Sequence, residues 1–114
     1  MRVEVINIET IKGELMSVEK LTTEQIEAGL KELPGWELKD GKLHRQLKLK
    51  NFVQAFGFMT QVAILAEQMD HHPEWFNVYS RVTIDLTTHE AGGISQRDIE
   101  LAQKINGILA TMGL

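Results

Sequence analysis

Three of the four histidines lie close together in the sequence, at His71, His72 and His89. The first two follow the carboxylates Glu67 and Asp70, which occupy the end of an apolar run with helical spacing. The C-terminal end of a helix disfavours negative charge and favours a protonated histidine beside it. Because histidine changes charge near neutral pH, this cluster has the groups needed to give and take protons in an acid/base reaction.

Pro73 and Trp75 follow the histidine pair and should shape the space around it. The residue before a proline favours extended backbone, so Pro73 should hold His72 out of the helix. His71 and His72 then point in different directions and have different tasks. Trp75 would supply an aromatic wall for a flat ligand. His89 reaches the same edge if its strand runs back beside the strand of Trp75.

A simpler interpretation stays open for each of these residues. Two adjacent histidines in a surface loop are common, and His89 can be no more than a polar residue at a strand end. A zinc site is less favoured, because adjacent histidines rarely converge on one ion and the sequence lacks the HExxH spacing. The fourth histidine, His44, lies in a predicted hairpin and is interpreted as structural or solvent-exposed.

Composition narrows the class of protein. A chain of 114 residues with 43% hydrophobic residues can form one modest core that gains from self-association. The absence of cysteine excludes a disulfide scaffold, a thiolate metal site and a cysteine nucleophile. A net charge of -4 argues against direct binding of nucleic acid. No apolar run approaches the roughly 20 residues of a membrane span and no secretory signal is recognised, so we expect a cytoplasmic protein.

Local patterns predict the elements that position the histidines. Thr22 and Ser95 begin two capping boxes, and Asp40-Gly41 suits a two-residue hairpin turn. The predicted elements are a helix from Thr22 that ends at Pro34-Gly35, strands at 36–38 and 43–49, a helix at 51–69, strands at 75–79 and 82–86, and a helix at 95–112. The helix after Asn51 carries an apolar stripe that would pack inward: Phe52, Ala55, Phe56, Met59, Val62, Ala63, Ala66 and Met69.

The order α-β-β-α-β-β-α predicts an α+β fold, in which a four-stranded antiparallel sheet carries helices packed on one face. Residues 18–114 should form this single domain. Residues 1–17 read as an N-terminal extension in which the pattern predicts no definite element.

The stretch from Glu67 to Asp98 resembles the pterin-4a-carbinolamine dehydratase family. It reads Glu-x-x-x-His-His-Pro-Glu-Trp, followed by Val78-Tyr79, Val82, Leu86, Thr88-His89, Gly93 and Asp98. The likeness extends more loosely from Leu21 to Met112 and includes the Pro34-Gly35-Trp36 turn. Residues 1–17 are not covered by it.

The resemblance implies a dehydratase that converts 4a-hydroxytetrahydropterin to quinonoid dihydropterin, in recycling of tetrahydrobiopterin, with neither metal nor organic cofactor. It implies that the catalytic residues are His71, His72 and His89, with Glu67 as the supporting acid. The substrate contacts would come from these histidines and from Pro73, Trp75, Thr88, Glu90 and Ala91. Mammalian members commonly carry cysteine at the position of Ala91, so this chain departs from them at that contact.

Dehydration needs an acid for the leaving oxygen and a base for a ring-nitrogen proton. We expect His71 and His89 to form this pair, in either order, His72 to position the substrate with some capacity for proton transfer, and Glu67 to orient or charge-tune a histidine. The resemblance also implies a homo-oligomer, a tetramer made of two dimers. An alternative function is a binding module, because some animal members of the family bind the dimerisation helices of a transcription factor.

Overall fold

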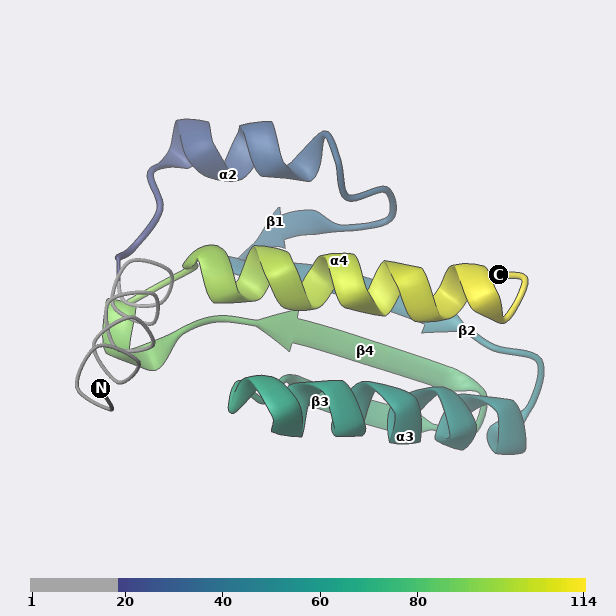
Figure 1. The fold of residues 1–114 in the computed structure, drawn as a ribbon. Helices are drawn as coiled ribbons and strands as arrows, with labels where there is room; N and C mark the ends of the chain where they lie inside the picture. Colours follow the sequence, from purple (N-terminus) through teal and green to yellow (C-terminus); the bar gives the residue numbers. More distant parts are fainter. Residues whose placement is uncertain (1–18) are drawn as a thin grey trace, which may run out of the picture.

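The computed structural model describes residues 19–114, and the extension expected over residues 1–17 lies outside this part. Its elements confirm the predicted order α-β-β-α-β-β-α and add one short 3-10 helix, η1 (Figure 1). The elements are α2 (Thr23–Leu30), β1 (Glu37–Lys39), β2 (Lys42–Lys48), α3 (Phe52–Met69), β3 (Glu74–Val78), β4 (Arg81–Leu86), η1 (His89–Ala91) and α4 (Gln96–Thr111).

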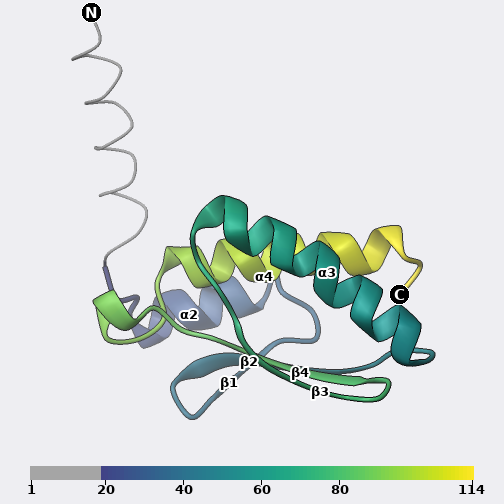
Figure 2. The ribbon, with the colours of Figure 1, turned by 90° about the horizontal axis from the view of Figure 1, so that it is seen from below.

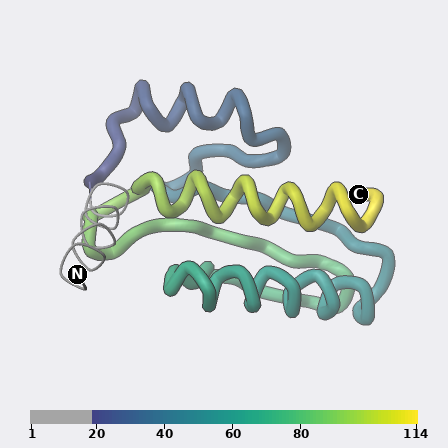
Figure 3. Tube along the Cα trace, in the orientation of Figure 1, coloured from purple at the N-terminus to yellow at the C-terminus, as the bar shows by residue number. Residues whose placement is uncertain are grey.

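The four strands form one antiparallel sheet in the order β1-β2-β4-β3. The three α-helices cover one face of this sheet, and α4 lies between α2 and α3 (Figures 2 and 3). Because β3 and β4 are antiparallel neighbours, the residues just before β3 and just after β4 lie at the same end of the sheet. The loop with His71 and His72 therefore meets the segment that begins with Thr87 and contains His89.

Local sequence signals explain where these elements begin and turn. Thr22 caps α2 and Ser95 caps α4, each within a capping box as predicted. Asp40 and Gly41 join β1 to β2 with φ values of 52° and 76°, the positive pair that a two-residue hairpin turn needs. The first helix ends earlier than predicted, at Leu30, because successive tight turns replace the helical hydrogen bonds on the way to β1.

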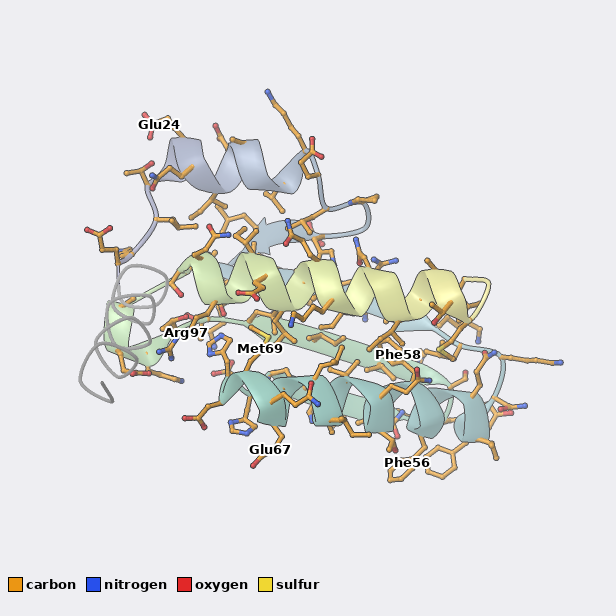
Figure 4. The ribbon with its side chains drawn as sticks, in the orientation of Figure 1. Glu24, Phe56, Phe58, Glu67, Met69 and Arg97 are labelled. Carbon is orange, nitrogen blue, oxygen red and sulfur yellow. The ribbon has the colours of Figure 1, made fainter. Side chains whose placement is uncertain are left out.

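The prediction for the apolar stripe of α3 is partly wrong. Of the predicted stripe, only Ala55, Val62 and Ala66 are fully buried, and the fourth buried residue of this helix is Phe58. Figure 4 shows Phe58 pointing toward α4, whereas Phe56 points away from it and is exposed. Apolar residues lie on several faces of α3, so spacing alone does not decide which face packs inward.

The core lies between the sheet and the helices. The predicted alternation of β4 is confirmed, because Val82, Ile84 and Leu86 are fully buried while the residues between them are not. The α4 helix supplies Leu101 and Ile105 from the other side. Within residues 19–114, no helix has both the length and the apolar character that crossing a membrane requires.

Candidate active site

A polar cavity of about 320 Å³ opens where α3 passes into β3 and where β4 passes into η1. Its lining comes from both segments and comprises Asp70, His71, His72, Thr87, His89 and Glu90. The antiparallel pairing of β3 with β4 brings the two segments to one end of the sheet. The fold therefore gathers on one cavity the three histidines that the sequence singles out.

The C-terminal end of α3 sets the position of His71. Asp70 takes a left-handed backbone conformation with φ of 52°, and its N–H group donates to the carbonyls of Ala66 and Glu67. The N–H group of His71 donates to the Ala66 carbonyl at 3.0 Å, which completes a Schellman-type helix end. This turn carries His71 inward, so that only 7% of the residue is exposed.

A buried hydrogen-bond network holds the His71 ring. Its Nε2 lies 2.6 Å from Oδ1 of Asp98, a residue that is 0% exposed. The other carboxylate oxygen of Asp98 accepts hydrogen bonds from the Thr88 hydroxyl at 2.8 Å and from the Ser95 backbone N–H at 2.9 Å. The hydroxyl oxygens of Thr88 and Ser95 lie 2.7 Å apart. Asp98 thus links the N-terminus of α4 to the histidine at the cavity.

The second histidine, His72, pairs with Glu67 on the outside of the molecule. Its Nε2 lies 2.9 Å from Oε1 of Glu67, and both side chains are exposed. Glu67 comes from the last turn of α3 and points away from α4 in Figure 4. Exposed ion pairs contribute little to stability, so the main effect of this contact is to orient the His72 ring.

The third histidine, His89, begins η1 and is the most exposed of the three, with 85% of its side chain accessible. Its Nε2 lies 3.5 Å from Oε2 of Glu74. The ammonium group of Lys42 donates to the other oxygen of Glu74 at 2.6 Å. This hydrogen bond, with the charges of Lys42 and His89, outweighs partial burial and lowers the pKa of Glu74. Glu74 therefore remains a carboxylate beside His89 at neutral pH.

The residues predicted for the site divide into two groups. His71, His72, His89 and Glu90 line the cavity, and Glu67 adjoins it through His72. Pro73, Trp75, Thr88 and Ala91 are absent from its lining.

Trp75 and Thr88 take positions other than those expected. The structure does not place Trp75 as an aromatic wall of this cavity, because the residue is partly buried against the core, where it pairs with Ile84 across the sheet. Thr88 is buried, and its hydroxyl belongs to the Asp98 network instead of the cavity surface. Thr88 therefore supports the site from behind, through Asp98 and His71.

Sequence reasoning did not assign Asp98 to the site. The capping box with Ser95 is confirmed, and the same carboxylate also reaches His71. One signal for this second role was present in the sequence. Asp98 shares helical spacing with Leu101, Ala102 and Ile105, so it lies on the buried face of α4, where a carboxylate needs polar partners.

His44 does not line the cavity. It is buried, and its Nδ1 lies 2.8 Å from Oδ1 of Asp85, so its role is structural and the alternative of solvent exposure is wrong. Across the part of the chain that the structure describes, no three histidine or carboxylate side chains converge as ligands for a metal ion.

Comparison with known proteins identifies similar chains. Residues 19–108 match the family model described as pterin 4 alpha carbinolamine dehydratase. A protein of Prochlorococcus marinus (strain MIT 9303), named "Putative pterin-4-alpha-carbinolamine dehydratase", is 57% identical over 91 residues, which cover 80% of this chain and 95% of that protein. A protein of the same name from Solibacter usitatus (strain Ellin6076) is 54% identical over 91 residues, which cover 80% of this chain and 96% of that protein.

A solved structure shares the fold. The crystal structure of a transcriptional coactivator/pterin dehydratase from Brucella Melitensis aligns with a TM-score of 0.76 and 46% sequence identity. The alignment covers 79% of this chain and 98% of the other. The similarity therefore extends over nearly the whole of that protein and most of this one.

Proposed function

Because the chain belongs to the pterin 4 alpha carbinolamine dehydratase family, we propose that it dehydrates 4a-hydroxytetrahydropterin to quinonoid dihydropterin. One observation carries this proposal most directly: a single cavity gathers three histidines, and each of them lies beside a carboxylate. In a cell that hydroxylates aromatic amino acids, the reaction would serve recycling of tetrahydrobiopterin.

The proposed chemistry needs only proton transfer. An acid donates a proton to the 4a-hydroxyl, the carbon–oxygen bond breaks, and water leaves. A base takes the proton of a ring nitrogen, so that the pterin ends as the neutral quinonoid form. His71 and His89 form the acid/base pair, while His72, oriented by Glu67, positions the substrate. The net change is the loss of one water molecule, which requires no metal or organic cofactor.

The experiment that tests the proposal measures turnover directly. Chemically generated 4a-hydroxytetrahydropterin decays on its own, and the purified protein should accelerate formation of the quinonoid product in proportion to its concentration. His71→Ala should abolish most of the acceleration. A rate equal to that of buffer alone, with folded protein at micromolar concentration, would refute the proposed activity.

We further propose that the chain assembles into a homo-oligomer, a dimer of dimers. Two exposed apolar surfaces support self-association: the outer face of α3, with Val53, Phe56 and Ile64, and the edge strand β3, with Phe76. Apolar surface of this kind is typical of interfaces. Sedimentation velocity should give a mass four times that of one chain, and Phe56→Ser should reduce it. A monomer at all concentrations would contradict this proposal.

A second candidate function is a binding module for a transcription factor. The Brucella Melitensis protein is named a coactivator as well as a dehydratase, and the exposed face of α3 offers an apolar surface for a partner helix. A dimerisation helix that binds this face should compete with self-association, whereas the dehydratase needs only the cavity. The expectations of a cytoplasmic location and of no direct nucleic-acid binding stay predictions.

A further inference from the structure

The buried contact between Asp98 and His71 has a role beyond packing. We infer that Asp98 is a positioning residue, which keeps one proton of His71 on Nε2 and leaves Nδ1 as the nitrogen that exchanges a proton with the substrate. This inference rests on the proposed dehydratase function and extends it to the group behind the catalytic histidine. It is carried by the directions of the hydrogen bonds around Asp98.

These directions follow from the number of protons available. Thr88 has one hydroxyl proton, which it donates to Oδ2 of Asp98. The short contact between the hydroxyls of Thr88 and Ser95 must then use the proton of Ser95. The Ser95 oxygen in turn accepts from the backbone N–H of Arg97 at 3.2 Å. The Ser95 hydroxyl therefore donates to Thr88, and the Thr88 hydroxyl donates to Asp98.

Asp98 is placed to act as an acceptor. It lies in the first turn of α4, where the helix dipole stabilises negative charge, and the Ser95 backbone N–H also donates to it. Its remaining oxygen, Oδ1, lies 2.6 Å from Nε2 of His71. A carboxylate accepts hydrogen bonds and has no proton to donate, so His71 must carry a proton on Nε2. The contact therefore selects one tautomer of the neutral ring.

Nδ1 is the ring nitrogen of His71 that takes no part in the contact with Asp98. Within residues 19–114 every fully buried side-chain nitrogen or oxygen has a hydrogen-bond partner, and Nδ1 of His71 makes no hydrogen bond to another described residue. Nδ1 is therefore reachable by solvent, and the accessible space next to His71 is the cavity that this residue lines. A substrate in the cavity would contact Nδ1, whereas Nε2 remains hydrogen-bonded to Asp98.

This arrangement serves proton transfer in either direction. When Nδ1 accepts a proton the ring becomes an imidazolium, and the adjacent carboxylate stabilises the new charge; when Nδ1 donates, the ring returns to the Nε2–H tautomer. The proton on Nε2 does not move in either case. Asp98 does not line the cavity, so it acts on the substrate through His71.

The first test needs no substitution. Nuclear magnetic resonance of protein labelled with ¹⁵N-histidine, at a pH where the His71 ring is neutral, should show the Nε2–H tautomer at this residue. The Nδ1–H tautomer would overturn the inference. This measurement does not depend on activity, so it decides the tautomer even if the wild-type protein has no dehydratase activity and the proposed function fails.

The second test reverses the direction of the hydrogen bond between residue 98 and Nε2 of His71. In Asp98→Asn the amide oxygen would accept from Thr88 and Ser95, so the amide nitrogen would donate to Nε2 and force the His71 proton onto Nδ1. Turnover should fall by about 100-fold or more while KM changes by less than about threefold, because the lost effect belongs to proton transfer. The His71 spectrum should change to the other tautomer.

The matched control is Asp85→Asn, which makes the same change beside His44 and outside the cavity. It should leave turnover and the His71 spectrum as in the wild type. If Asp98→Asn does not fold, Thr88→Val removes one donor to the carboxylate and should lower turnover by about tenfold, in keeping with one hydrogen bond to a charged group. Folded variants of Asp98 or Thr88 with wild-type turnover would overturn the inference.

Discussion

Replacing His71 or His89 by alanine should slow catalysis alike but affect stability differently. Each change removes one member of the proposed acid/base pair, so each should lower turnover by about 100-fold or more. The double substitution should cost less than the product of the two single losses, because groups that act as a unit are not additive. The two single variants should nevertheless differ in thermal stability, which turnover measurements do not detect.

The difference in stability follows from burial. His71→Ala leaves the Oδ1 oxygen of the fully buried Asp98 without its hydrogen-bond partner, which costs roughly 1–3 kcal/mol of unfolding free energy. For a domain of this size a loss of 1 kcal/mol lowers Tm by roughly 4–8 °C. His89 is largely exposed and its nearest carboxylate is 3.5 Å away, so His89→Ala should leave Tm nearly unchanged.

Two measurements on the same samples check this reasoning: thermal unfolding by circular dichroism, and turnover with chemically generated substrate. His44→Ala is the control, because it breaks another histidine–carboxylate contact, the partly buried one with Asp85, and neither residue lines the cavity. It should lower Tm and leave turnover intact. The reasoning is refuted if His44→Ala slows turnover as much as His71→Ala, or if folded His71→Ala and His89→Ala both keep near-normal turnover.

Further substitutions and treatments test other parts of the structure. Asp70→Gly should raise the unfolding free energy by roughly 0.5–1 kcal/mol in denaturant titration, because glycine adopts the positive φ of this helix end without strain; a loss of stability would contradict this. Phe58→Ala should cost roughly 3–5 kcal/mol, whereas Phe56→Ala, on the exposed face, should cost far less in a monomeric sample; equal losses would refute the assignment of the buried face. Dialysis against a chelator should leave turnover unchanged, and a loss restored by zinc would reject histidine-only catalysis. A chain that starts at Met16 should fold and keep its turnover, since the family match begins at residue 19; an insoluble product would place residues 1–15 in a core or an interface.

The order of elements was predictable because its signals are local. The capping boxes at Thr22 and Ser95 and the Asp40-Gly41 turn are each formed by residues within a few positions of one another. Such contacts depend on backbone geometry that the sequence encodes directly. The alternation of β4 was equally clear, because one face of its strand is buried and the other is not.

The residues on the cavity were predictable in part. His71, His72, His89 and Glu90 were named from residue type and spacing, together with a family resemblance, and all four line one cavity. Their meeting follows from the antiparallel pairing of two strands that the sequence already indicated. The position of Trp75 was not predictable in this way, because periodicity does not say whether an aromatic side chain lines a cavity or fills the core beside it.

The amino-acid sequence by itself determined the elements, their order and the chemical groups available at the site. Tertiary structure alone decided which face of α3 is buried, where Phe58 packs inward, and which carboxylate holds His71. Asp98 lies 27 positions away from His71, and the two meet because the first turn of α4 lies against the end of α3. The sequence specified an aspartate that caps α4 through Oδ2. Only the packing of the helices on the sheet brought its other oxygen, Oδ1, next to the ring of His71.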